Sequence, residues 1–279
     1  MFGVILVSIG TFFGEISDAI GKNKAENHKE SAYTLGFLSL FWGAIFFAAI
    51  SLFKNDAFVF KASSLPTFSL RVILEIIQLY VSVFALIAAD RTTFNFFRTA
   101  TIPLLLLMDL ILGYKIGNPA VVGMSVIIIT LLVLFSSKEI KKRGSGLIMF
   151  SAVNAVLTVS LFKYDISHYN SVAAEQLLMS LILLVCFFAL SKFKAKENPL
   201  MFLTKPIFSL QSVSAGLGGV VESFAFNYGS ASVMIAAKRS SAIFWSIISG
   251  KTYFKEKHVL FKFFVFGFLL IGLIFLAVG

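Results

Sequence analysis

Three basic residues lie inside apolar stretches, where a charge is costly. Arg98 lies early in one stretch, and Lys238 and Arg239 are neighbours at a similar point of a later one. An ionisable side chain within a membrane span costs at least about 2.5 to 3.5 kcal/mol, so it usually faces a cavity or an opposite charge. Arg holds a carboxylate or phosphate with two parallel hydrogen bonds, and Lys adds a point charge. The three side chains therefore predict a substrate-binding site for an anionic group.

Glu222 is the most deeply placed acidic residue, and it follows Gly-Leu-Gly-Gly at 216–219, where missing side chains let helices approach closely. We expect Glu222 or Glu75 to take and give a proton, or to pair with Arg239 when the site is empty. The alternative is a permanent structural ion pair, in which the basic residues only neutralise these carboxylates or extend to lipid headgroups.

Two further polar faces have helical spacing. Glu15 and Asp18 share a face at spacing three, with Lys22 one turn further on, and they are candidates for coupling transport to protons. The second face adds candidate substrate contacts and carries Glu75, Gln78 and Ser82. Both faces are expected to point inward. Glu175 and Asp109 are expected near span ends, in contact with water.

Aromatic side chains are candidates for stacking on a substrate, and a Tyr hydroxyl can orient it. The candidates are Tyr80, Trp42, Tyr228, Trp245 and Phe226. Trp42 and Trp245 are interpreted first as packing or interface anchors.

The composition excludes a water-soluble monomer. Hydrophobic residues make up 58% of the 279 residues and charged residues only 14%, against about 25% charged in soluble domains. The net charge of +10 does not indicate nucleic acid, because the basic residues flank apolar runs as headgroup-facing residues do. The single Cys186 allows no intramolecular disulfide, and the three separated histidines do not suggest a metal site. We expect no cofactor, and the lipid bilayer as the principal partner.

Three short motifs do not carry a function. Ser-Gly-Lys-Thr at 249–252 copies the end of a phosphate-binding loop, but Trp245 stands where that loop needs its first glycine. Ser240 and Ser241 have no recognisable general base, so the chain is not expected to be an enzyme. Gly10 and Gly14 form a small-xxx-small pair, which indicates close helix packing or a homodimer.

Apolar runs long enough to cross a bilayer, roughly 20 residues each, predict ten membrane-spanning helices and an all-α fold. The predicted spans are approximately 2–19, 33–53, 69–89, 93–113, 119–136, 146–163, 171–191, 207–227, 231–250 and 259–278. The stretch from Arg98 to about 135 parallels the stretch from Lys238 to about 275, at an offset of roughly 140 residues. Five spans per half invert the second half, so the chain divides into two inverted five-helix repeats, 1–143 and 144–279.

The chain resembles a known transporter family at particular residues. Lys-Arg-Ser-Ser at 238–241, Tyr-Phe-Lys-Glu at 253–256, and Gly250, Gly267 and Gly272 look like the ninth and tenth helices of the drug/metabolite transporter superfamily, EamA-like branch. Pro103, Gly113 and Gly123 look like its fourth and fifth helices. Two positions depart from the pattern: Ile116 replaces the usual acidic residue, and no proline in the ninth span matches Pro103.

The resemblance implies a ten-helix secondary transporter in the cell membrane that moves small metabolites by alternating access. In the triose-phosphate branch, which Arg98, Lys238 and Arg239 resemble, these positions hold the phosphate. We therefore expect exchange or proton-coupled transport of a substrate with an anionic group. The substrate anion is expected to replace Glu222 as the partner of Arg239. Alternatives are an amino-acid or cationic-drug exporter of the same fold, a protein that handles lipid headgroups, or a passive channel.

The orientation has two conflicting indications. The odd-numbered connections between the predicted spans carry sixteen Lys and Arg residues, including Lys22, Arg91 and Lys262. The even-numbered connections carry five. The positive-inside rule then places the odd connections in the cytoplasm and both termini outside. The family resemblance implies cytoplasmic termini.

Overall fold

The computed structural model describes residues 2–54, 57–111, 117–137, 143–229 and 231–278, and these residues form helices and no strand. The side chain of Asp109 lies outside the described part. The helices are α1 (Phe2–Glu26), α2 (Ala32–Phe53), η1 (Ala62–Ser64), α3 (Leu65–Ala88), α4 (Arg91–Arg98), α5 (Thr101–Ile111), α6 (Asn118–Ser136), α7 (Ser145–His168), α8 (Val172–Phe193), α9 (Pro199–Phe202), α10 (Pro206–Ala225), η2 (Phe226–Tyr228), α11 (Ala231–Thr252) and α12 (Val259–Val278).

Six helical segments of the described residues are long and apolar enough to cross a bilayer: α1, α2, η1 with α3, α7, α8 and α11. The surface is apolar as well as the core. In α8, Phe187 is fully buried while Val185, two residues away on the opposite side, is 71% exposed. An apolar side chain gains nothing by facing water, so such a surface is built for lipid. The chain is an all-helical, multi-pass membrane protein.

The described parts of the predicted spans fall on helices, and the helix of the fourth span is broken. Helix α4 ends at Arg98 and α5 begins at Thr101. The Thr99 hydroxyl donates to the Phe96 carbonyl, and the Ile102 N–H bonds to the Thr99 carbonyl in a tight turn. Pro103 is the third residue of α5, where a missing N–H leaves no bond unmade. The proline therefore starts the second half of the span rather than kinking a continuous helix.

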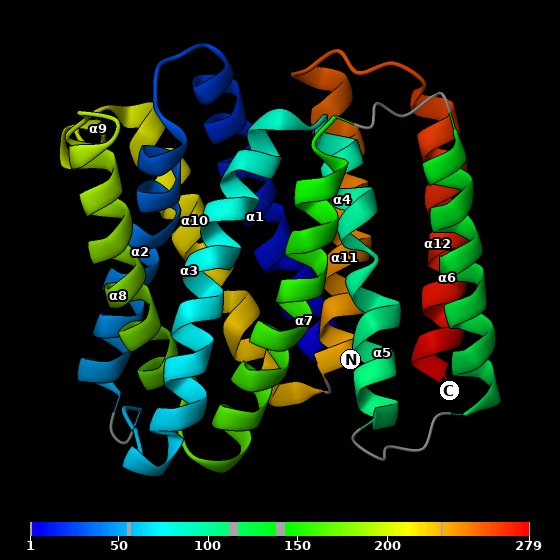
Figure 1. Cartoon of the computed structure of the whole chain (residues 1–279), viewed down its shortest axis with the longest axis horizontal. Coiled ribbons are helices and arrows are strands. Elements are labelled where there is room, and N and C mark those ends of the chain that lie inside the picture. Colours follow the sequence, from blue (N-terminus) through cyan, green and yellow to red (C-terminus); the bar gives the residue numbers. More distant parts are fainter. Residues whose placement is uncertain (1, 55–56, 112–116, 138–142, 230, 279) are drawn as a thin grey trace.

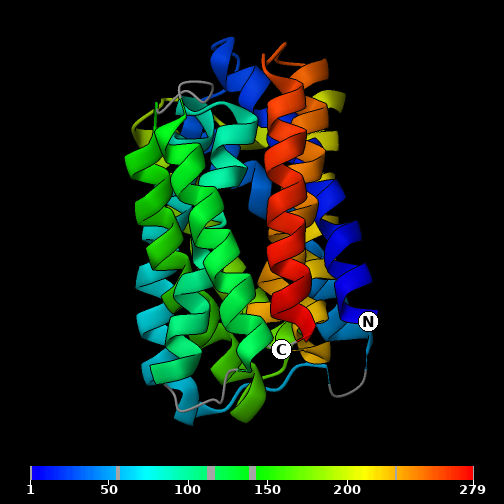
Figure 2. The same ribbon diagram turned by 90° about the vertical axis from the view of Figure 1, so that its right-hand side faces the viewer.

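The helices stand roughly parallel in one bundle (Figure 1). Helices α6 and α12 pack together at one end of the molecule, and α2 packs on α8 at the opposite end (Figures 1 and 2). The centre is filled by α1, α3, α4, α7, α10 and α11 (Figure 1). Both chain ends lie on the same face of the bundle (Figures 1 and 2), which agrees with an even number of crossings.

Helices α1 and α10 approach closely because both carry glycine at the contact. A Cβ atom on Gly218 would lie 2.7 Å from the carbonyl oxygen of Gly10 and 3.0 Å from the backbone nitrogen of Gly14. No side chain larger than hydrogen fits between backbones at that separation. The small-xxx-small pair of α1 is therefore used for packing within the chain.

Candidate functional site

A cavity of about 400 Å³ lies in the bundle, with walls from α1, α2, α3, α4, α7, α8, α10, η2 and α11. Its charged lining consists of Asp18, Arg71, Glu75, Arg98, Glu222 and Lys238. A second cavity, of about 230 Å³, shares Asp18, Arg98, Glu222 and Lys238 with the first. It adds Glu15 and Arg239 to this set. The structure thus brings most of the predicted site residues together around two cavities that share part of their lining.

The three predicted basic residues all line the second cavity, but their partners differ. The Lys238 ammonium lies 2.6 Å from a Glu222 carboxylate oxygen. Arg239 is almost fully buried, and its Nε donates to the Thr101 hydroxyl at 3.2 Å. Arg98 stacks over the Phe94 ring at 5.1 Å, and its buried Nε has no hydrogen-bond partner among the described residues. Arg98 is therefore the guanidinium with the most unused bonding capacity.

Glu222 pairs with Lys238, and not with Arg239 as the sequence suggested. The other carboxylate oxygen of Glu222 accepts a hydrogen bond from the Thr11 hydroxyl at 3.0 Å. Gly10 makes this arrangement possible, because a Cβ there would lie 2.6 Å from the Glu222 Cγ. Neighbouring residues on a helix point about 100° apart, so Lys238 and Arg239 cannot both turn toward one carboxylate.

The α3 wall of the cavity carries an ion pair that the sequence analysis did not find. Arg71 is 3% exposed and its Nη1 lies 2.8 Å from the Glu175 carboxylate, which is fully buried. Glu175, expected in water near a span end, also accepts a hydrogen bond from Asn170 at 2.5 Å. The spacing of four between Arg71 and Glu75 was the available signal; Arg71 Nη2 lies 3.6 Å from the Glu75 carboxylate.

Gln78 lines the cavity while joining α3 to α7. Its Nε2 donates to the Ser151 hydroxyl at 2.7 Å and to the Ser82 hydroxyl at 3.2 Å, and its carbonyl oxygen accepts from Asn154 at 2.9 Å. The predicted face of Glu75, Gln78 and Ser82 therefore points inward. Because both N–H donors of the Gln78 amide are engaged and its oxygen accepts from Asn154, the side chain fixes the position of α3 against α7.

Tyr80, a predicted substrate contact, lies outside the lining of both cavities. It packs against Tyr33 and Phe84 with ring centroids 6.1 and 4.9 Å apart. Two residues along a helix turn the side chain by about 200°, so Tyr80 must face away when Gln78 faces the cavity. Of the other aromatic candidates, Phe226 lines the large cavity, whereas Trp42, Trp245 and Tyr228 pack on neighbouring aromatic rings.

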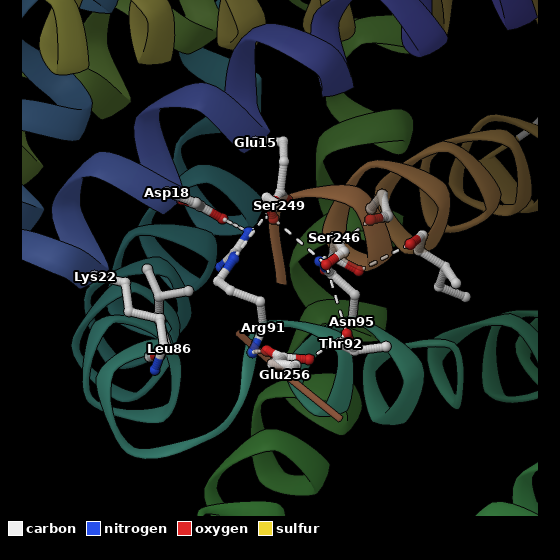
Figure 3. A network of polar contacts seen from close by, with 12 residues as sticks. Glu15, Asp18, Lys22, Leu86, Arg91, Thr92, Asn95, Ser246, Ser249 and Glu256 are labelled. Carbon is white, nitrogen blue, oxygen red and sulfur yellow. Dashed lines mark hydrogen bonds and ion pairs between the residues drawn. The ribbon is translucent and has the colours of Figure 1, made fainter. Parts of the chain in front are cut away.

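A polar network closes the bundle at the face opposite the chain ends, and Figure 3 shows it centred on Arg91. The Arg91 guanidinium contacts Glu15 through Nε at 3.1 Å and Nη2 at 2.5 Å, and Nη2 also reaches Asp18 at 3.2 Å. Ser249 donates to Glu15 at 2.5 Å. Arg91 was counted among the charges of the odd-numbered connections, and the structure buries it fully. Glu15 and Asp18, the candidate coupling residues, therefore already share a cation.

Glu256 connects α4 to α12 in the same network. Its carboxylate accepts from the Arg91 N–H at 2.7 Å, the Thr92 hydroxyl at 2.5 Å and the Lys262 ammonium at 2.6 Å. Burial of Glu256 opposes ionisation, but the bonds and charge of Lys262, with Thr92 and the Arg91 N–H, hold its pKa below its ordinary value. Lys262, which was also counted among the charges of the odd-numbered connections, is buried as well.

Lys22 was likewise expected to face headgroups, but it is 3% exposed and binds the end of α3. Its ammonium donates to the carbonyl oxygens of Leu86, Ile87 and Ala89 at 3.1, 3.1 and 2.6 Å. The last carbonyls of a helix have no partner within the helix, and a cation there also complements the helix dipole. Lys22 therefore fixes α1 to the end of α3.

In the part of the chain that the structure describes, no group of three or more His, Cys, Asp or Glu side chains is arranged to hold a metal ion. The chain matches no protein-family model and no curated protein sequence. The site is accordingly interpreted from its geometry alone.

Proposed function

We propose that this protein is a secondary transporter that moves a small metabolite with an anionic group across the cell membrane by alternating access. The observation that carries the proposal is the position of Arg98 and Lys238. Arg98 lies in the first proposed half of the chain and Lys238 at the equivalent point of the second, and both line the same two cavities. A shared midplane site between two related halves is the arrangement that secondary transporters use.

The helix order supports two inverted repeats, 1–143 and 144–279. Four pairs of helices begin at a nearly constant offset: α2 and α8 at Ala32 and Val172, α4 and α11 at Arg91 and Ala231, α3 and α10 at Leu65 and Pro206, and α6 and α12 at Asn118 and Val259. Ser31 and Ser171 cap α2 and α8 in the same way, each accepting a hydrogen bond from the N–H three residues later at 3.2 Å. With five crossings per half, the second half has the opposite orientation, and a ten-helix protein results.

Contacts between the halves fit the same scheme. An in-plane two-fold axis pairs α2 with α8 and α6 with α12, and both pairs are in contact. The same axis relates α3 to α10 and α7 to α1, so a contact between α3 and α7 requires one between α10 and α1. Both contacts are present. On this basis we propose membership of the drug/metabolite transporter superfamily, in its EamA-like branch.

The proposed transport step begins with the Lys238 and Glu222 pair. A substrate carboxylate or phosphate entering the cavity bonds to Arg98 and takes Lys238 from Glu222. Glu222 then keeps only its hydrogen bond from the Thr11 hydroxyl. If transport is proton-coupled, Glu222 is the group that carries the proton. If it is not, Glu222 pairs with Lys238 again when the empty carrier returns. Arg239 contributes positive charge from the wall while it holds Thr101.

The test is exchange by the purified protein in liposomes, with a panel of amino acids, sugar phosphates, dicarboxylates and cationic drugs. Ligands are first selected by thermal unfolding, because a compound that binds only the folded state raises the midpoint. We expect saturable exchange of a compound with an anionic group, lost in Lys238→Ala/Arg239→Ala and retained in Lys251→Ala, an exposed lysine on the same helix. If the double variant exchanged substrate as fast as the wild type, Lys238 and Arg239 would not form the substrate site. Non-saturable flux would indicate a channel.

A further inference from the structure

Two buried carboxyl groups contact each other at the face of the bundle that holds the chain ends. Asp165 lies in the last turn of α7 and Glu175 in the first turn of α8 (Figure 1). Both are fully buried, and the Asp165 carboxyl group is hydrogen-bonded to that of Glu175. Within the described residues no donor reaches Oδ2 of Asp165. Like charges in contact and out of water do not both ionise, so the two carboxyl groups share a proton.

The other contacts of this Asp165–Glu175 pair come from neutral groups and one cation. The Asn170 amide donates to Glu175 at 2.5 Å, and the Thr67 hydroxyl lies 2.5 Å from Asp165 Oδ1. Arg71, with Nη1 2.8 Å from Glu175, is the ion-pair partner of the two carboxyl groups among the described residues. Two carboxyl groups with one proton carry a single negative charge, which Arg71 balances.

The neighbouring titratable groups have other surroundings. His168 lies one turn beyond Asp165 and is exposed, with Nδ1 2.9 Å from the Tyr164 carbonyl oxygen. The Lys163 ammonium donates to the Phe226 carbonyl at 2.7 Å. The remaining ones on the elements around the pair are Glu75 on α3, Glu222 on α10, Tyr228 in η2, Tyr164 and Tyr169 at the end of α7, and the exposed Lys54 and Lys61 between α2 and α3.

Thr67 connects the pair to water at the chain-end face. Its hydroxyl oxygen contacts both Asp165 Oδ1 and, at 2.9 Å, the Ser64 carbonyl oxygen. A hydroxyl has one proton to donate, so it serves one of these acceptors at a time. Because Thr67 is partly exposed, its oxygen can accept the proton of Asp165 while its own proton passes to water. The charge of the pair then changes from one negative to two.

Arg71 connects the pair to the large cavity. It lines the cavity wall, and its buried Nε has no acceptor in the described part of the chain. Its Nη2 lies 3.6 Å from Glu75, which also lines the cavity. An anion that enters this space adds a negative charge, and a proton on the pair adds a positive one. Binding both leaves the net charge unchanged, whereas the anion alone is buried without compensation.

We propose that the Asp165–Glu175 pair is the proton-binding site of this transporter, and that the proton and the substrate anion cross in the same direction. This inference rests on the proposed transport function and names its coupling ion and the place where that ion binds. It moves the coupling proton from Glu222 to the pair. Glu222 has a cation, Lys238, that can return to it, whereas Oδ2 of Asp165 faces only another carboxyl group.

The experiment follows the proton directly, with the dye pyranine trapped in liposomes that contain the purified full-length protein. Each sugar phosphate and dicarboxylate of the panel is added outside, and protein-free liposomes measure the leak. We expect at least one of these anions to acidify the interior of the wild-type liposomes, because anion and proton enter together.

Asp165→Asn fixes the pair in its protonated charge state, since the amide cannot release a proton. Acidification should fall to the leak in this variant, while exchange of the labelled anion at equal pH on both sides persists. A variant that is only misfolded loses both activities. The matched control is Glu26→Gln, an acid-to-amide change at a 43% exposed side chain near the opposite face, which should acidify the liposomes as the wild type does.

If Asp165→Asn does not fold, Thr67→Val tests the same site, because it removes the hydroxyl and keeps both carboxyl groups. Its rate of acidification relative to exchange should be lower than in the wild type, and an equal ratio would overturn the proposal.

Three further results would overturn the proton site and leave the transport function: anion exchange without proton movement in the wild type, a requirement for Na⁺, or alkalinisation of the interior. Loss of proton movement in Glu222→Gln but not in Asp165→Asn would return the proton to Glu222. Absence of exchange with every compound of the panel would overturn both proposals.

Discussion

Arg98 and Lys238 face the same cavities, but within the described residues only Lys238 has a carboxylate partner, Glu222 at 2.6 Å. Equivalent positions in the two proposed halves thus hold a free and a paired cation. In the transport step proposed above, the substrate carboxylate or phosphate therefore bonds to Arg98 first, because bonding there displaces no existing ion pair.

The contact between α1 and α10 predicts a sharp difference between adjacent glycines. Gly218→Ala should lower the free energy of unfolding by about 1 to 3 kcal/mol, because its Cβ would meet the Gly10 carbonyl at 2.7 Å and rigid backbones must separate. Gly219→Ala is the matched control, since nothing lies within 4 Å of a Cβ at that position. Thermal unfolding in detergent measures both, and equal midpoints for the two variants would contradict the packing.

The network around Arg91 predicts a large effect from one buried charge. Arg91→Met should destabilise the protein by about 3 to 5 kcal/mol, because it leaves the Glu15 carboxylate buried without a cation. The double variant Arg91→Met/Glu15→Leu should recover part of this loss, since neither charge then remains. The measurement is a double-mutant cycle on unfolding midpoints, and strictly additive effects would show that the two side chains are not coupled.

Lys22 predicts a difference between two lysines of the same helix. Lys22→Met should cost about 1 to 3 kcal/mol, because the buried carbonyls of Leu86 and Ala89 lose their donor. Lys24→Met, whose side chain is half-exposed, should change stability by less than about 0.5 kcal/mol. Unfolding midpoints compare the two variants. A Lys22 variant as stable as the Lys24 variant would show that the carbonyls find water instead.

The connection between α1 and α2 predicts a pH effect. Burial of Glu30, with the neighbouring Glu197 charge, raises its pKa to about 8, while Gln211 and Lys24 act in the opposite direction. The folded protein then holds a proton that the unfolded chain, with a pKa near 4.5, releases. Stability should therefore fall as pH rises from about 4.5 to about 8, by at most about 1.4 kcal/mol per pH unit from this group.

The Glu30→Gln variant tests this sign, because the amide keeps the contact with Gln211 and cannot titrate. Its unfolding midpoint should decline less between pH 5 and 8 than that of the wild type, and the two proteins should differ most at the alkaline end. Parallel pH profiles would assign the effect to other groups. Glu256, whose pKa is lowered, loses its contribution only as pH falls, so it does not mimic this profile.

The sequence predicted the helices well because each apolar run is long and bounded by polar residues. It also placed Arg98, Lys238 and Glu222 among the charges that should face inward, since an intramembrane charge must avoid lipid. The break after Arg98 was not found, because Thr99 and Ala100 are ordinary helix residues and the turn depends on a local hydrogen bond between Thr99 and Phe96.

Charges at the ends of the runs were harder to interpret. Arg91 and Lys262 lie beside apolar stretches, as headgroup-facing residues do. The burial of Arg91 depends on a partner in the distant helix α1, and that of Lys262 depends on the α11–α12 connection. Arg71 and Glu175 are 104 residues apart, so no local pattern predicts their contact. Tyr80 lies outside both cavities because its position on the helix is opposite that of Gln78, and this helical phase can be derived from the sequence.

Lys22 has different surroundings during membrane insertion and in the folded protein. Lys22 is synthesised before the Leu86 and Ala89 carbonyls that hold its ammonium in the folded protein. At that time Lys22 is a flanking positive charge of the kind that sets helix orientation during insertion. Once the bundle has assembled, the same charge is withdrawn from the surface. Lys22 therefore belongs among the positive charges that orient the chain during insertion. It does not belong among the charges at the surface of the folded protein.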